Sequence, residues 1–169
     1  MRLNKNIRII FLFIYILFSF NIISCSSYYR CSRKNNSTIK ANSSNYKVND
    51  YFKESLNNAL CDSTLLISNI KKKGNKKSDY INYLNIYKKQ IEKISLDFTN
   101  NTQNLDTSKS KELISIANNM FNSLEESTSN ISLGIENNSP KKIAKGFLSF
   151  LNALHNLKSY YVAHYENKS

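Results

Sequence analysis

The sequence is poor in the residues that make tight turns. Its 169 residues include three Gly, one Pro and no Trp. All-β sandwiches and barrels place Gly and Pro at many turns, so this scarcity disfavours those folds. The Gly-rich phosphate loops G-x-G-x-x-G and G-x-x-x-x-G-K do not occur in the sequence, and nothing therefore indicates a nucleotide-binding fold.

Groupings of catalytic or metal-binding residues are also missing. His155 and His164 do not share a helical face well, and they have no Asp or Cys beside them. Glu125 and Glu126 are adjacent, so their carboxylates diverge and cannot form an acid–base pair. The three Cys make no C-x-x-C pair, and no Ser stands in a G-x-S-x-G context. We therefore expect no enzymatic activity, no cofactor and no metal site.

Acidic residues are scarce relative to basic ones. The chain has 24 Lys and Arg against 12 Asp and Glu, which gives a formal charge of +12. A chain this basic calls for an anionic class of partner, namely nucleic acid, anionic lipid or a sulfated polysaccharide. The compartment in which the chain works decides between these partners.

The first 24 residues differ from the remainder. Three basic residues and no acidic one precede an apolar run at 9–18. Ser19 and Asn21 interrupt the run before it reaches the roughly 20 apolar residues that a membrane-spanning helix needs. A short apolar run after a basic start is typical of a secretory signal peptide, which we predict over residues 1–24.

Ser24 and Cys25 resemble the relaxed lipobox of spirochaete lipoproteins, in which a small residue precedes the cysteine that carries diacylglycerol. We predict lipidation at Cys25, because two or three acyl chains give a stable membrane anchor. We expect the chain to be anchored at the cell outer membrane and exposed at the surface, and a position on the periplasmic face is the alternative. An ordinary signal peptide with an incidental Cys and an uncleaved anchor remain alternatives.

Cleavage after Ser24 leaves 21 basic and 12 acidic side chains, a charge near +9. An exported lipoprotein meets no cytosolic nucleic acid, so we expect no nucleic-acid partner. Two cysteines remain besides Cys25. Export permits a disulfide between Cys31 and Cys61, and two separate thiols are an equal alternative.

The mature chain divides into a tether and a folded domain. Residues 25–48 are rich in Ser, Asn and Lys and lack apolar periodicity, which predicts a disordered tether. Residues 49–169 carry apolar stripes at three- and four-residue spacing, and they form the domain. Helices are predicted over 50–70 with Asp50 as cap, from Ser78 to about 98, from Thr107 to between 124 and 135, and from Pro140 with Ser139 as cap. Residues 100–106 are predicted to form a loop. The third helix is expected to be weakest at 127–130.

Each predicted helix is apolar along one side only. In the last helix the stripe is expected to comprise Ile143, Ala144, Phe147, Leu148, Leu151, Leu154, Leu157 and Tyr161. Four such stripes bury one another in a bundle, and short connections favour antiparallel neighbours. The predicted fold is all-α, a single antiparallel helical bundle of four to five helices.

The last two predicted helices resemble a known family. Glu136 to Pro140 (ENNSP) leads into Ala144-x-Gly146-Phe147-Leu148, and ISNIKKK at 67–73 stands before Gly74. With ANNMFNSL at 117–124, these stretches are similar to the decorin-binding lipoproteins of Lyme-type (Borrelia) spirochaetes. The resemblance implies a helical-bundle surface adhesin that binds glycosaminoglycan chains of host proteoglycans. It matches the family's closing helix less well, because Asn152, Leu157 and Ser159 stand where basic residues are expected.

Lysines gather in three places, which are candidates for binding a sulfated chain. The family's basic linker is matched by Lys71, Lys72, Lys73, Lys76 and Lys77; Lys89 and Lys93 lie one turn apart on the second helix; Lys141, Lys142 and Lys145 open the last helix. Cations at a helix N-terminus oppose the helix dipole, so the last group does not stabilise its helix. A solvated loop in a lysine-rich chain is the plainer alternative for the first group.

Three functions remain open at this point. The first is an adhesin for host glycosaminoglycan or proteoglycan, and the second is a lipoprotein that binds a complement or plasma protein through a helical face. The third is a structural lipoprotein. One contiguous basic face would favour the polysaccharide, whereas lysines dispersed all around would indicate composition bias.

Overall fold

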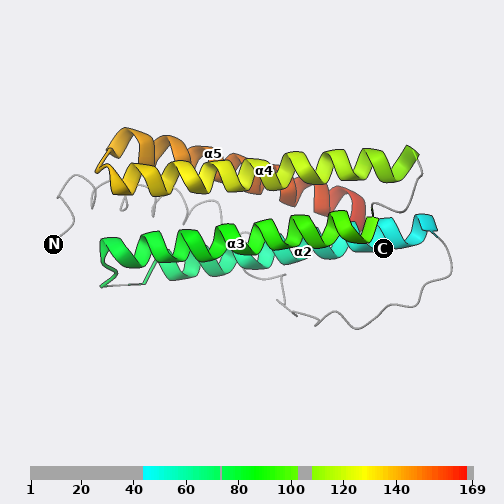
Figure 1. Ribbon diagram of the computed structural model, residues 1–169, viewed down its shortest axis with the longest axis horizontal. Coiled ribbons are helices and arrows are strands. Elements are labelled where there is room, and N and C mark those ends of the chain that lie inside the picture. The colour runs from blue at the N-terminus through cyan, green and yellow to red at the C-terminus, as the bar shows by residue number, and fades with distance from the viewer. Residues whose placement is uncertain (1–43, 73, 103–107, 167–169) are drawn as a thin grey trace.

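The computed structural model describes residues 44–72, 74–102 and 108–166, and within these ranges the chain is all-α (Figure 1). The helices are α2 (Ser44–Ile70), α3 (Lys77–Thr102), α4 (Ser108–Glu136) and α5 (Pro140–Tyr161), followed by a π-helical turn, η1 (Val162–Glu166). No strand occurs in the described ranges, and the predicted helical bundle is confirmed.

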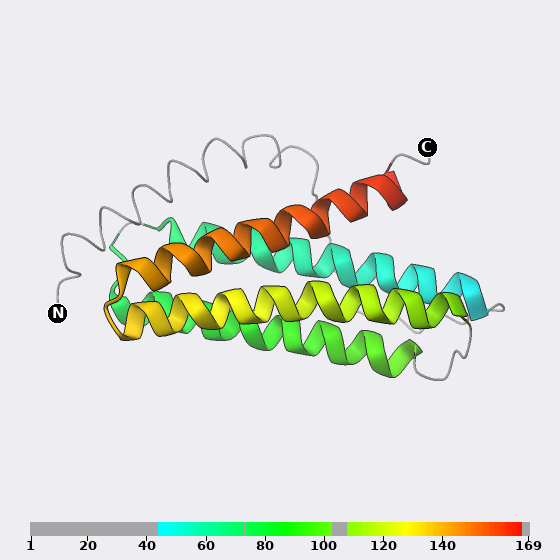
Figure 2. The ribbon, with the colours of Figure 1, turned by 90° about the horizontal axis from the view of Figure 1, so that it is seen from above.

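Successive helices run antiparallel, and the four form a bundle (Figure 2). The most extensive packing is between α4 and α5, followed by α3 with α4 and α2 with α3. The smaller contact of α2 with α5 closes the ring. Because the chain reverses at every connection, the α2–α3 and α4–α5 connections lie at the same end of the bundle (Figures 1 and 2).

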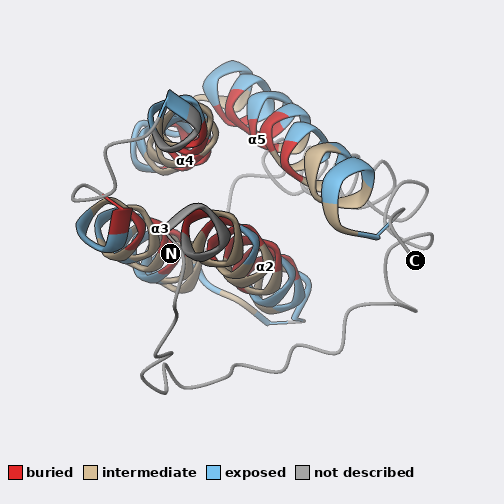
Figure 3. Ribbon diagram, turned by 90° about the vertical axis from the view of Figure 1, so that its right-hand side faces the viewer, coloured by how far each residue is buried: buried red, intermediate tan, exposed pale blue. Residues whose placement is uncertain are grey.

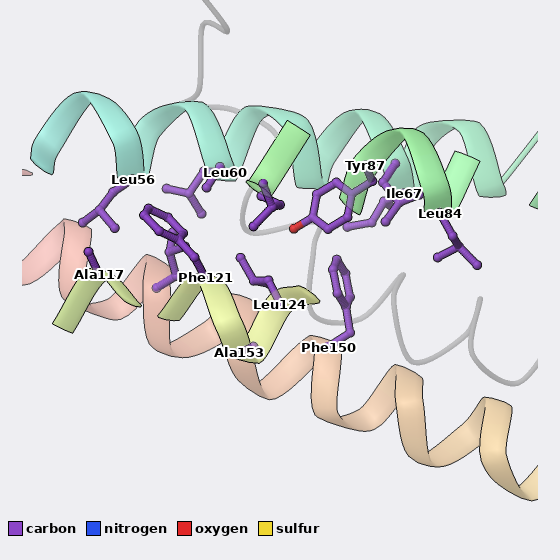
Figure 4. Close-up of a cluster of buried hydrophobic side chains, with 14 of the residues drawn as sticks. Leu56, Leu60, Ile67, Leu84, Tyr87, Ala117, Phe121, Leu124, Phe150 and Ala153 are labelled. Carbon is purple, nitrogen blue, oxygen red and sulfur yellow. The ribbon is translucent and has the colours of Figure 1, made fainter. Parts of the chain in front are cut away.

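The core is mostly apolar, and it includes a hydrogen-bonded pair of hydroxyl groups. Buried residues of every helix face inward (Figure 3), and a central layer of leucines and aromatic residues fills the space between the helices (Figure 4). The Tyr87 ring packs edge-on against Phe150, with ring centroids 5.7 Å apart. Its hydroxyl lies 2.8 Å from Ser63 Oγ on α2, so the buried phenol is hydrogen-bonded.

Two glycines allow α4 and α5 to approach closely. A Cβ atom on Gly134 would lie 2.7 Å from the backbone nitrogen of Ile143, and one on Gly146 would lie 2.8 Å from that of Ile131. Any side chain at these positions would collide with backbone atoms of the facing helix. The α4–α5 pair therefore depends on both residues.

The first helix is longer than predicted. It begins at Ser44, so Asp50 lies inside α2 and does not cap it. Val48, assigned to the tether by its polar neighbours, is 1% exposed. The Tyr165 hydroxyl donates to Asn49 Oδ1 at 3.1 Å, so the end of the chain supports the beginning of this helix. A contact between residues so far apart in the sequence cannot be predicted from local sequence patterns.

Helices α3 and α4 also persist where breaks were expected. Asn100 to Thr102 belong to α3, so the expected loop begins too early; residues 103–107 lie outside the described part. Helix α4 runs unbroken through 127–130, where the Ser127 and Thr128 hydroxyls donate to the carbonyl of Leu124 in the preceding turn.

In α5 the buried face differs from the predicted stripe. Leu148 is 61% exposed and Ala144 is exposed, which contradicts their assignment to the core. Gly146, Phe150 and Ala153 occupy the buried face instead. The close approach at Gly146 sets the rotation of the helix, and a residue two positions later then points away from α4.

Several predictions fall outside the described residues. These are the signal peptide at 1–24, lipidation at Cys25, and residues 25–43 of the tether. Cys61 is half-buried on α2, but Cys31 is outside the described part, so their disulfide remains a prediction. None of the described helices contains an apolar stretch long enough to span a bilayer.

Candidate polyanion-binding site

Two of the three lysine groups lie at the same end of the bundle. The α2–α3 connection and the first two turns of α5 are both found there (Figures 1 and 2). We call this surface the lysine end; it comprises Lys71, Lys72, Lys76, Lys77, Lys141, Lys142 and Lys145. All of these side chains are exposed except Lys77, which is half-buried. Lys73 belongs to the same stretch of sequence but is outside the described residues.

The α2–α3 connection is held by its own polar side chains. Gly74 has a φ of +87°, and the chain turns there. Asn75 Nδ2 donates to the carbonyl oxygens of Asn69 at 2.8 Å and Ile70 at 3.3 Å, at the end of α2. The Asn69 carbonyl also accepts the backbone N–H of Lys72 at 3.2 Å. Asp79 Oδ2 accepts the backbone N–H of Lys76 at 2.7 Å, just before α3 begins. These bonds hold Asn75 to the end of α2 and Lys76 to the start of α3.

The α4–α5 connection is a Schellman turn. The Ser139 N–H donates to the Gly134 carbonyl at 2.8 Å, and the Asn138 N–H donates to that of Ile135 at 3.2 Å. Asn138 has a φ of +50°, in the left-handed region that this motif requires and that Asn tolerates. The turn reverses the chain within a few residues, and it brings the start of α5 beside the end of α4.

A lysine side chain joins the two connections. Lys77 Nζ, from the first turn of α3, donates to the Glu136 carbonyl at 3.0 Å and to Asn138 Oδ1 at 3.1 Å. These bonds tie the beginning of α3 to the end of α4. The two connections at the lysine end are thus joined by a side chain.

The first turn of α5 is electrostatically unusual. Ser139 is its N-cap, as predicted, but makes no side-chain capping hydrogen bond. The first turn contains no acidic residue and instead has Lys141 and Lys142, both exposed. The partial positive charge of the helix N-terminus adds to that of the lysines, which raises the potential felt by an anion.

Acidic residues are few at this end. Segments 69–79 and 134–145 hold eight lysines, Lys73 included, and two carboxylates, Asp79 and Glu136. Asp79 also accepts the hydrogen bond that opens α3. The net charge of this end is therefore strongly positive, as a site for closely spaced anionic groups needs.

Lys89 and Lys93 do not join the lysine end. Both are exposed on α3, about 18 and 24 Å along the helix from Lys77 at 1.5 Å per residue. Between them Glu92 forms an ion pair with Lys88, with Oε1 and Nζ 3.8 Å apart. This part of α3 carries both signs of charge, and we exclude it from the site.

The other side chains that could have chemical roles make contacts within the fold. His164 stacks on Tyr160 with ring centroids 3.9 Å apart, and its Nδ1 lies 2.9 Å from the Tyr160 carbonyl oxygen. Burial raises the pKa of Glu125, and the neighbouring charge of Glu92 raises it further. No group of three or more potential metal ligands occurs among the described residues. Tyr80, Tyr83 and Tyr87 pack in or against the core.

Sequence reasoning missed the residues that shape the site. Asn75 and Asn138 fix the two connections. Because Asn is abundant in this sequence, the role of a single Asn could not be predicted from it. Lys77 was predicted as a binding residue, whereas its ammonium contacts protein acceptors. No protein-family model, no curated protein and no solved structure matches this chain.

Proposed function

We propose that the protein is a lipid-anchored adhesin of the cell outer membrane that binds host glycosaminoglycan or proteoglycan at the lysine end. The observation that carries this proposal is that two lysine groups, distant in sequence, lie at the same end of the bundle, where carboxylates are few. A sulfated chain presents closely spaced anions, and several lysines on one surface bind it with release of counterions. The resemblance to decorin-binding lipoproteins points to the same class of ligand.

The direction of α2 supports this proposal. The helix starts at Ser44, the part of the domain that follows the predicted anchor at Cys25 in the sequence, and ends at the lysine end. Its 27 residues make it about 40 Å long at 1.5 Å per residue. A chain anchored at Cys25 would attach to the membrane through the opposite end of the bundle, which leaves the lysine end free to face outward.

The test compares two variants of equal net charge. In the first, six lysines of the lysine end become Gln: Lys71, Lys72, Lys76, Lys141, Lys142 and Lys145. In the second, six lysines elsewhere become Gln: Lys53, Lys88, Lys89, Lys93, Lys111 and Lys158. Affinity for size-defined heparin is measured by calorimetry at several salt concentrations, and circular dichroism confirms that both variants fold.

We expect the first variant to lose affinity by about 100-fold or more, because each lost contact removes counterion release as it does for nucleic-acid phosphates. The second variant should stay within about threefold of wild type. Equal losses in both variants would mean that only total charge matters, and the proposal would be wrong. Binding of a host serum protein that soluble heparin does not compete would favour the protein-binding alternative.

The anchor has a separate test. Growth of the bacterium with an alkyne fatty acid should label the wild-type chain and leave Cys25→Ala unlabelled. Label that persists in Cys25→Ala would contradict lipidation at this cysteine.

A further inference from the structure

We infer that Lys77 is a positioning residue of the lysine end, which holds the two groups of polyanion-binding lysines in one arrangement and does not itself bind the polyanion. This inference rests on the proposed function. It gives Lys77 a different role from the other lysines of the lysine end, although Lys77 belongs to the same cluster in the sequence.

The surroundings of Lys77 support this role. Its ammonium has three N–H donors, and two are used by the Glu136 carbonyl and Asn138 Oδ1 at 3.0 and 3.1 Å. The side chain is half-buried, whereas Lys76, its neighbour, is exposed. For all of its N–H groups to bind a sulfate, the Lys77 ammonium would have to break its hydrogen bonds to Glu136 and Asn138 at the α4–α5 connection.

The electrostatics of Lys77 also differ from those of Lys141 and Lys142. Glu136 is the last residue of α4, so its carbonyl lacks a partner within the helix and carries part of the negative end of the dipole. The Lys77 ammonium lies against this negative end and is held there. Lys141 and Lys142 lie at the positive end of α5, where nothing in the helix favours their charge.

The consequence for binding is preorganisation. Asn75 and Asp79 hold the α2–α3 connection to its own helices, and the Schellman turn holds the α4–α5 connection to α4. The Lys77 bonds fix one connection relative to the other. A polyanion that touches both groups then spends less free energy on ordering them, which raises its affinity without a contact to Lys77.

The test uses the full mature chain with three single substitutions: Lys77→Met, Lys77→Arg and, as an exposed neighbour that the site uses directly, Lys76→Met. Heparin affinity is measured as a function of salt concentration. The slope of log affinity against log salt counts the cationic contacts, with a change of about 0.7–0.9 for each contact in nucleic-acid complexes.

We expect Lys77→Met to weaken heparin binding about three- to tenfold, from the added cost of ordering the connections, and to leave the salt slope unchanged. Lys77→Arg, which can still donate to both acceptors, should restore the affinity. Lys76→Met should lower the slope by about one contact. A fall in slope for Lys77→Met like that of Lys76→Met would show that Lys77 binds the polyanion and would overturn the inference, as would unchanged affinity.

Amide hydrogen exchange without polysaccharide provides a separate readout. In Lys77→Met the Asn138 and Ser139 amides should exchange at least about threefold faster than in wild type, since opening of this turn becomes easier. Exchange in Lys77→Arg should match wild type. If wild-type protein does not bind heparin, the proposed function fails and the binding role of Lys77 fails with it. If heparin binds but exchange does not change in Lys77→Met, the positioning role alone is wrong.

Discussion

The hydroxyl of Tyr87 shows how a polar group is accommodated in the middle of an apolar bundle. Ser63 Oγ donates to the Ala59 carbonyl at 2.7 Å, so its proton is committed there. Its oxygen is left to accept the Tyr87 hydroxyl at 2.8 Å. Both groups are satisfied, and the ring occupies the centre of the core (Figure 4).

This arrangement predicts a loss of stability in alkaline solution. Burial raises the pKa of Tyr87 above its ordinary value of about 10, because the phenolate would be desolvated. The folded state therefore holds the proton more tightly than the unfolded state, so the stability from Tyr87 is complete below about pH 10 and declines above it. In Tyr87→Phe, urea unfolding between pH 8 and 11 should show a shallower decline than in wild type. Equal declines would contradict this assignment.

Gly146 gives a second prediction at the scale of one residue. Alanine favours helices over glycine by about 1 kcal/mol, so Gly146→Ala would stabilise α5 if space allowed. Its Cβ would lie 2.8 Å from both the backbone nitrogen and Cγ1 of Ile131, and α4 would have to move. We expect a net destabilisation of about 1–3 kcal/mol in urea unfolding.

The matched control for Gly146→Ala is Ser149→Ala, on the exposed side of the same helix. It should change the free energy of unfolding by less than about 0.5 kcal/mol. A Gly146→Ala protein as stable as wild type would mean that the helices are not packed as closely as described.

Among the elements, α5 has basic residues at both ends, and its dipole distinguishes them. Lys141 lies in the first turn, at the positive end, and Lys158 lies in the last turn, at the negative end. The first position is unfavourable for a cation and the second is favourable. An unfavourable charge retained at the start of a helix is consistent with a binding role.

Charge reversal at the two ends should therefore have opposite effects on stability. Lys141→Glu should raise the free energy of unfolding by about 0.3–1 kcal/mol and weaken heparin binding, whereas Lys158→Glu should lower the free energy of unfolding by a similar amount. Thermal unfolding at low salt and heparin affinity measure the two quantities. A destabilised Lys141→Glu protein would indicate that this lysine stabilises the fold.

Local patterns in the sequence predicted the helices where local signals exist. The apolar periodicity predicted a helix where α3 occurs, and Pro140 marked the start of α5. The start of α2 was missed because it depends on Asn49 and Tyr165, 116 residues apart. Leu148 was assigned to the core because leucine is apolar and its position fits the predicted stripe. The rotation of α5 is instead set by a glycine contact with α4. Such contacts between helices are not encoded in the spacing within one helix.

At the scale of the whole molecule, the alternating direction of the helices places the lysine end. The first and third connections of an up-and-down bundle lie at the same end, so the lysines of the α2–α3 connection are at the same end as those at the start of α5 (Figure 1). The lysine groups themselves were visible in the sequence. The bonds from Lys77 to Glu136 and Asn138 were not, because they depend on how two connections face each other.

The most direct test of the account is a nuclear magnetic resonance titration of the ¹⁵N-labelled mature chain with a heparin hexasaccharide at moderate salt. The account predicts that amide shifts concentrate in residues 69–79 and 137–146, and that Lys89, Lys93 and the end of the bundle where α2 begins change little. Shifts spread evenly over lysines on every face, or centred on α3 around Lys89 and Lys93, would contradict it.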